Sequence, residues 1–125
     1  TAAPVLVPRT ADDRHETLTR EALADGVSDA AFLLTMERKR PPAQQSPEWI
    51  ERWISAIRRS IAFFEAHTPA RDQPDLGDIA LACALGYVDL RHGDLGWRKD
   101  SPALSTWFET MSSRPAIALT APPPG

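Results

Sequence analysis

The chain has 125 residues, 14 basic and 17 acidic side chains, and a single cysteine. One cysteine excludes an internal disulfide framework, and the acidic balance disfavours nucleic-acid binding, including a helical DNA-binding regulator. No apolar run could span a bilayer and no secretory signal opens the chain, so we expect a single-domain cytoplasmic protein without membrane or nucleic-acid partners.

Residues 1–10 hold two prolines and no helical period, which predicts an extended linker. An unstructured N-terminal tail would have the same composition. The chain opens on Thr1 without an initiator methionine. We interpret it as a fragment of a longer protein, and a processed product is the alternative.

A first helix is predicted from about residues 10–12 to about Arg40, where Pro41 and Pro42 stop it. Apolar residues recur along it at spacings of four, three and four, which indicates one buried face. These residues are Leu23, Val27, Ala30 and Leu34.

The middle of this helix carries a stripe of small residues, Ala22, Gly26 and Ala30, with Asp25 and Asp29 beside it. A glycine inside a helix costs about 1 kcal/mol relative to alanine. We therefore expect the missing side chain to serve a close helix crossing or to leave space for a ligand. Close packing alone explains the stripe equally well, and a solvated face explains the acids.

A second helix begins at Ser46 and Pro47 and runs to about His67. Its apolar residues again repeat at helical spacing and predict a buried stripe made of Ile50, Ile54, Ile57, Ile61 and Phe64. Trp49 and Trp53 are assigned to the core beside it.

The most informative stretch is the predicted central helix, residues 75–91. From Ile79 to Val88 it has no charged or strongly polar side chain, which is typical of a helix surrounded by others. Asp75 at the N-cap and Asp78 three residues later form a capping box. Gly93 is expected to end the helix in a left-handed conformation.

Ser101 and Pro102 repeat the cap-then-proline helix start, and Arg114-Pro115 breaks that helix before one further turn through Leu119. The apolar face of this helix consists of Leu104, Trp107, Phe108 and Met111. Residues 121–125 predict a flexible tail. The fold class is therefore all-α, a bundle of about five helices over residues 11–120.

Few residues of this chain are suited to catalysis. His15, His67 and His92 show no metal-like spacing with Cys83, so no metal site is predicted and each histidine is expected at the surface. Cys83 lies inside the apolar helix, where a thiol is usually an inert small hydrophobe. No catalytic residue is assigned.

The segment from Asp75 through Asp78 and the apolar run to Tyr87 strongly resembles the capping box and core helix of the all-helical C-terminal domain of cytosolic, bacterial-type glutathione S-transferases. That family usually carries Ser or Thr at the cap, so Asp75 is a chemically equivalent departure. Four further segments match in order, namely 21–31, 94–97, 102–107 and 114–115.

This resemblance implies that the full-length enzyme has two domains with different roles. In the family a linker, here at the position of Pro4 to Pro8, joins the helical domain to an N-terminal thioredoxin-like domain that activates the glutathione thiol. The helical domain supplies the pocket for a hydrophobic electrophile and part of a homodimer interface. We therefore expect glutathione as the cosubstrate of the full-length enzyme, no cofactor bound by this domain, and no catalysis by this chain alone.

The resemblance also assigns site residues. Ala22, Asp25, Gly26 and Asp29 correspond to the first-helix surface that faces the substrate cleft and the partner subunit. Tyr87 corresponds to the aromatic end of the core helix beside that cleft. The alternative is a non-catalytic interaction module, because the same domain resembles assembly domains of translation factors and tRNA synthetases. An apolar cleft with Tyr87 at its edge favours the enzyme; a large exposed apolar patch without a cleft favours the module.

Overall fold

The structure, a computed structural model, describes residues 5–123. Within that range the chain is all-helical, as predicted, with five α-helices and three short 3-10 helices. The α-helices are α1 (Ala11–Arg38), α2 (Pro47–Ala66), α3 (Leu76–His92), α4 (Pro102–Ser112) and α5 (Pro115–Ala118). The 3-10 helices are η1 (Pro42–Gln44), η2 (Gly93–Leu95) and η3 (Trp97–Lys99). The predictions for residues 1–4 and 124–125 lie outside the described part.

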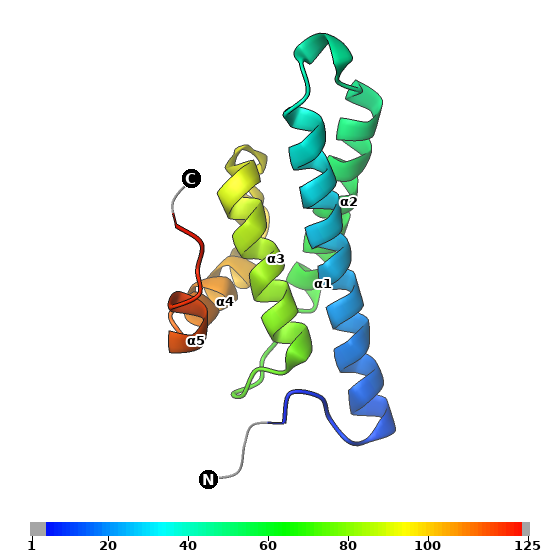
Figure 1. Ribbon diagram of the computed structural model, residues 1–125. Helices are drawn as coiled ribbons and strands as arrows, with labels where there is room; N and C mark the ends of the chain where they lie inside the picture. The colour runs from blue at the N-terminus through cyan, green and yellow to red at the C-terminus, as the bar shows by residue number, and fades with distance from the viewer. Residues whose placement is uncertain (1–4, 124–125) are drawn as a thin grey trace.

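The long helices α1 and α2 form an antiparallel pair, and α3 lies alongside α1 (Figure 1). Helices α4 and α5 lie on the other side of α3, so α3 is covered from both sides as the sequence predicted. Its core side chains Leu81, Leu85 and Val88 are almost completely buried. Burying each such side chain is worth about 1.5–3 kcal/mol, which makes α3 the organising element of the bundle.

The buried face of α1 is rotated slightly from the predicted one. Residues 17, 20, 24, 27, 31 and 34 are buried, at alternating spacings of three and four. Ala30 is buried as predicted, whereas Leu23 is only partly buried and packs at the edge of the core. The buried residues of α1 therefore include polar ones, and the partners of Thr17 and Arg20 are described below.

The assignment of Trp49 to the core is wrong, because its side chain is 48% exposed. It stands in the first turn of α2, in the part of that helix that extends beyond the end of α3 (Figure 1). Trp49 instead contacts Trp53, at 5.5 Å between ring centroids, and lies under the guanidinium of Arg52. Trp53 itself is partly buried against the core.

The predicted left-handed end at Gly93 is also wrong. Gly93 has a φ of −57°, because the chain continues from α3 directly into the right-handed η2. The left-handed residue comes three positions later, at Gly96, whose φ of 58° favours glycine. The segment between α3 and α4 is thereby folded back toward α2.

Candidate functional site

The start of α3 contains the predicted capping box. Asp75 Oδ1 accepts a hydrogen bond from the Asp78 amide at 3.0 Å, and Asp78 Oδ2 accepts from the Asp75 amide at 3.0 Å. Both carboxylates are buried. The two bonds satisfy amides that the enclosed helix start would otherwise leave without partners.

The same carboxylates connect α3 to α1. Arg20 Nη1 donates to Asp78 Oδ1 at 2.7 Å, and its other terminal nitrogen donates to Asp75. Thr17 Oγ1 donates to Asp75 Oδ2 at 2.8 Å, and Arg71 pairs with Asp75 from the loop before α3. Sequence reasoning missed these contacts. Arg20 is in helical register with the buried face of α1. That register could have indicated these contacts, because a buried arginine needs an acidic partner.

The cluster shifts the pKa values of the two acids in opposite directions. Burial raises the pKa of Asp78, and the nearby negative charge of Asp75 adds to the effect. Burial also acts to raise the pKa of Asp75, but hydrogen bonds from Arg20, from the Asp78 amide and from Thr17 outweigh it and hold that pKa below its usual value. The ionised form of Asp75 is therefore the one that anchors α1.

Gly77 permits this contact. A Cβ atom added there would lie 2.8 Å from Arg20 Nη1 and 2.9 Å from the carbonyl oxygen of Thr17. The second of these is backbone and cannot move without displacing α1. The close approach of α1 and α3 therefore requires a residue without a side chain.

A mainly apolar cavity of about 260 Å³ lies among α3, α4, α5 and the segment that follows α5. From α3 it is lined by Ala82, Cys83, Gly86 and Tyr87, from α4 by Phe108 and Ser112, and from the C-terminal part by Ile117, Thr120, Ala121 and Pro122. Cys83 was expected to be an inert small hydrophobe inside an apolar helix, but its side chain is exposed. The reason is that Cys83 faces the cavity side of α3 rather than α1.

The hydroxyl of Tyr87 donates a hydrogen bond to Thr35 Oγ1 on α1, at 3.2 Å. Thr35 in turn lies 2.9 Å from Nε2 of His92 and donates to the carbonyl oxygen of Ala31 at 2.8 Å. The prediction that His92 is a surface residue is therefore wrong. It is 1% exposed, because the last turn of α3 packs onto α1.

The far side of His92 is closed by an ion pair. Arg38 Nη1 lies 3.1 Å from His92 Nδ1, and Arg38 also donates two hydrogen bonds of 3.1 Å to Asp94. These bonds hold the pKa of Asp94 below its usual value. A continuous chain of polar contacts thus runs from Asp94 to the hydroxyl of Tyr87.

The four predicted site residues of α1 lie elsewhere. Ala22, Asp25, Gly26 and Asp29 are all exposed, and none of them lines the Tyr87 cavity. A Cβ atom added at Gly26 would meet no atom within 4 Å, so packing inside this chain does not explain the glycine. Their role in binding stays a prediction.

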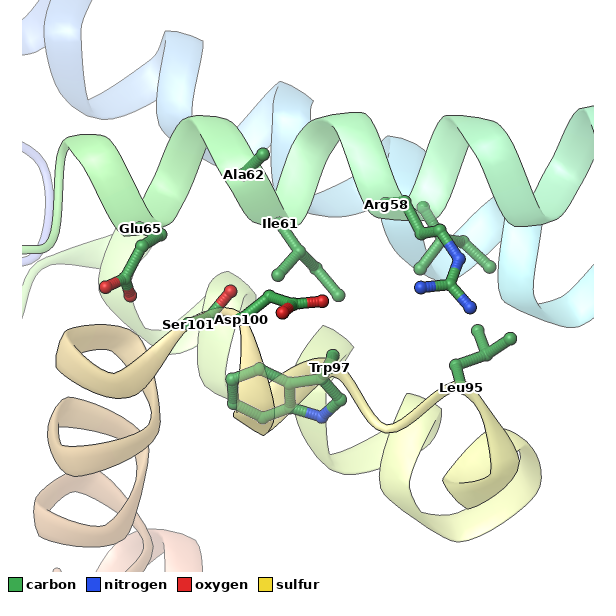
Figure 2. A pocket seen from close by; sticks show the side chains of 9 residues that line it. Arg58, Ile61, Ala62, Glu65, Leu95, Trp97, Asp100 and Ser101 are labelled. Atoms are coloured by element: carbon green, nitrogen blue, oxygen red, sulfur yellow. The ribbon is translucent and has the colours of Figure 1, made fainter.

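A second cavity, of about 270 Å³, lies between α2 and the η2–η3 segment. Figure 2 shows Ile61 pointing from α2 toward Asp100 and Trp97, with Arg58 above Leu95. The sequence did not predict this cavity, because its walls come from segments that only the turn at Gly96 brings together.

One wall of this cavity holds the start of α4. The Glu65 carboxylate accepts hydrogen bonds from the amides of Ala103 and Leu104 at 3.1 and 2.7 Å. The helix start at Ser101 and Pro102 is confirmed, but the side chain of Ser101 makes no capping bond. The acceptor at this helix start is instead Glu65, which lies 38 residues from Ala103 in the sequence.

No cluster of side chains suited to hold a metal occurs among residues 5–123. Within the same part of the chain, no helix has both the length and the apolar character needed to cross a membrane.

The sequence pattern of the family described as "Glutathione S-transferase, C-terminal domain" matches residues 47–110, half of the chain. The chain is also 38% identical to YibF of Escherichia coli K12, which is described as an uncharacterized GST-like protein. That match covers 97% of this chain and 62% of YibF.

Solved structures of similar proteins carry glutathione derivatives. A glutathione transferase family member from Pseudomonas fluorescens Pf-5, with bound S-(propanoic acid)-glutathione, matches with a TM-score of 0.92 at 40% identity, over 98% of this chain and 64% of that protein. A glutathione S-transferase from Methylobacterium radiotolerans JCM 2831, in complex with glutathione sulfonate, matches with a TM-score of 0.87 at 31% identity, over 95% and 58%. The chain thus spans less than two thirds of the length of these relatives.

Proposed function

Because the chain belongs to the family of glutathione S-transferase C-terminal domains, we propose that it supplies the hydrophobic-electrophile pocket of a cytoplasmic enzyme that conjugates glutathione. An N-terminal thioredoxin-like domain of the same protein would bind glutathione and activate its thiol. The bound ligands of the Pseudomonas and Methylobacterium proteins support glutathione as the cosubstrate.

The observation that carries the proposal is the apolar cavity beside Tyr87. Ligand pockets are usually apolar with a few polar groups that fix orientation. This cavity has that composition, because Phe108 and Ile117 supply apolar surface and Tyr87 supplies a phenol. Its volume of about 260 Å³ suits a small, mainly apolar molecule.

The exposed face of α1 supports a second part of the proposal. The four residues Ala22, Asp25, Gly26 and Asp29 are exposed, and a Cβ atom added at Gly26 would meet no atom within 4 Å. We assign this surface to the interface with a second subunit and, because it lines no part of the Tyr87 cavity, to a separate part of the substrate cleft.

The pocket is tested by filling it. Gly86 lines the cavity, and a Cβ atom added there would lie 3.9 Å from Phe108, an ordinary contact. Gly86→Leu in the full-length protein should raise KM for an aryl halide about tenfold, the effect of removing most of one apolar contact surface, while the Kd for glutathione stays unchanged. An unaltered KM would place the electrophile elsewhere.

A non-catalytic interaction module remains the second candidate, because large apolar side chains are exposed near the turn between α1 and α2. They are Phe32, Leu33, Met36 and Trp49. Such a group favours contact with another protein. A full-length protein that binds a partner through this group but conjugates no electrophile would support the module.

A further inference from the structure

The cavity between α2 and the η2–η3 segment has a mainly apolar wall. It is lined by four buried apolar side chains, those of Ile57, Ile61, Leu95 and Trp97. The indole N–H of Trp97 donates to Asp89 at 2.8 Å, so the ring offers the cavity apolar surface. The volume of about 270 Å³ suits one small organic molecule.

Two opposite charges point into this cavity. Figure 2 shows the guanidinium of Arg58, which comes from α2, and the carboxylate of Asp100, which follows η3, both directed into the space between the two segments. Neither side chain has a hydrogen-bond or ion-pair partner among residues 5–123. The cavity therefore presents one cation and one anion that the described part of the chain does not neutralise.

The side of the cavity that holds Asp100 has two further polar groups. The Glu65 carboxylate accepts from the amides of Ala103 and Leu104, so it adds negative charge but is already hydrogen-bonded. Only 3% of Ser101 is exposed, yet its hydroxyl has no hydrogen-bond partner among the described residues. Buried polar groups normally have a partner, so a molecule in the cavity is expected to supply one. The Ser101 oxygen can accept from a cation at this side.

We propose that this cavity binds a free α-amino acid with an apolar side chain of medium size. Its carboxylate pairs with Arg58, its ammonium group with Asp100 and the Ser101 hydroxyl, and its side chain lies on the apolar wall. A ligand with a single charge would leave either Arg58 or Asp100 without a partner. Because both line one cavity of only about 270 Å³, the two charges of the ligand must lie close together, as they do in an α-amino acid.

This proposal is independent of the proposed function. The cavity shares no lining residue with the one beside Tyr87, and the two are built from different elements apart from their common chain. Failure of the amino-acid site would therefore leave the electrophile pocket untouched, and the reverse also holds.

Three ligands of similar size provide the test. L-Phenylalanine has both charged groups, 2-phenylethylamine lacks the carboxylate, and 3-phenylpropanoate lacks the ammonium group. Their Kd values for the full-length protein are measured by ligand-detected NMR. L-Phenylalanine should bind about three- to tenfold more tightly than either analogue, as expected for one partly exposed, hydrogen-bonded ion pair. Undetectable binding of L-phenylalanine, or equal Kd values for the three ligands, would overturn the proposal.

Two variants locate the binding, and both change exposed side chains whose loss should leave folding intact. Arg58→Met removes the partner of the carboxylate, so L-phenylalanine should lose most of its advantage over 2-phenylethylamine and keep its advantage over 3-phenylpropanoate. Asp100→Ala removes the partner of the ammonium group and should have the reverse effect.

Arg59→Met is the matched control. Arg59 is the exposed neighbour of Arg58 on α2 and does not line the cavity, so its loss should leave all three Kd values unchanged. If the advantages of L-phenylalanine survived both Arg58→Met and Asp100→Ala, or fell equally in Arg59→Met, the amino acid would bind elsewhere and the proposal would fail.

Discussion

At the scale of single residues, the acids at the start of α3 have two tasks. They satisfy amides of their own helix, and they neutralise Arg20 from α1. Sequence reasoning found the first task, because a capping box is a local pattern with fixed spacing. The second joins residues 55 and 58 positions apart, which no local pattern specifies.

Asp78→Ala should therefore cost more than the loss of a helix cap. It removes the acceptor for the Asp75 amide and leaves the buried Arg20 with one partner fewer. We expect the free energy of unfolding to fall by about 2 to 4 kcal/mol, between the values for a lost cap and a broken buried ion pair. Urea unfolding of the chain measures it.

Asp25→Ala is the matched control for that experiment. Asp25 is an exposed acid on α1, and its removal should change stability by less than about 0.5 kcal/mol. If Asp78→Ala were as mild as this control, the cluster would contribute little to folding.

At the scale of elements, two glycines of α3 should respond in opposite ways to the same substitution. Gly77→Ala introduces a Cβ atom 2.9 Å from the Thr17 carbonyl oxygen, so α1 must shift and the protein should lose about 1 to 3 kcal/mol. Gly86→Ala meets only Phe108 at 3.9 Å and should gain up to about 1 kcal/mol from helix propensity.

Thermal melting of the two variants beside the parent compares these effects directly. A lower Tm for Gly77→Ala and an unchanged or higher Tm for Gly86→Ala are the predicted results. Destabilisation of both variants to the same extent would mean that glycine at Gly77 is not needed for the close approach of the two helices.

The elements themselves were largely predictable, because helix starts and apolar periods are local. The starts at Pro47, Leu76 and Pro102 follow directly from their preceding residues. The wrong predictions concern which side chains of each helix are buried and which are exposed. Trp49 is exposed in the first turn of α2, and Cys83 faces a cavity; neither fact is encoded in the period of its own helix.

The resemblance led us to expect Tyr87 beside a substrate cleft, and that role stays a prediction. The cavity that Tyr87 lines has walls from α4 and from residues near the C-terminus, which the sequence did not indicate. His92 was assigned to the surface because its spacing from Cys83 and the other histidines indicated no metal site. Its burial depends on the packing of Thr35 and Arg38 from α1, which lie more than 50 positions away.

At the scale of the whole molecule, the exposed face of α1 should matter only in an assembly. A Cβ atom added at Gly26 meets no atom within 4 Å, so we expect the Gly26→Leu chain to fold as well as before. In the full-length protein the new side chain should obstruct the proposed subunit interface and shift the dimer toward monomer in sedimentation velocity.

Ala103→Leu, at an exposed site on α4, serves as the control and should leave assembly unchanged. A full-length Gly26→Leu protein that remained dimeric and fully active would remove this surface from both the interface and the cleft.

The proposed role of this chain is to shape the pocket for the electrophile while the N-terminal domain binds glutathione. The most direct measurement is the kinetics of full-length Tyr87→Ala with a series of aryl halides, together with its Kd for glutathione. We expect kcat/KM for the electrophile to fall by the equivalent of about 1 to 3 kcal/mol, with the Kd for glutathione unchanged. An altered affinity for glutathione with the ranking of the electrophiles unchanged would contradict it.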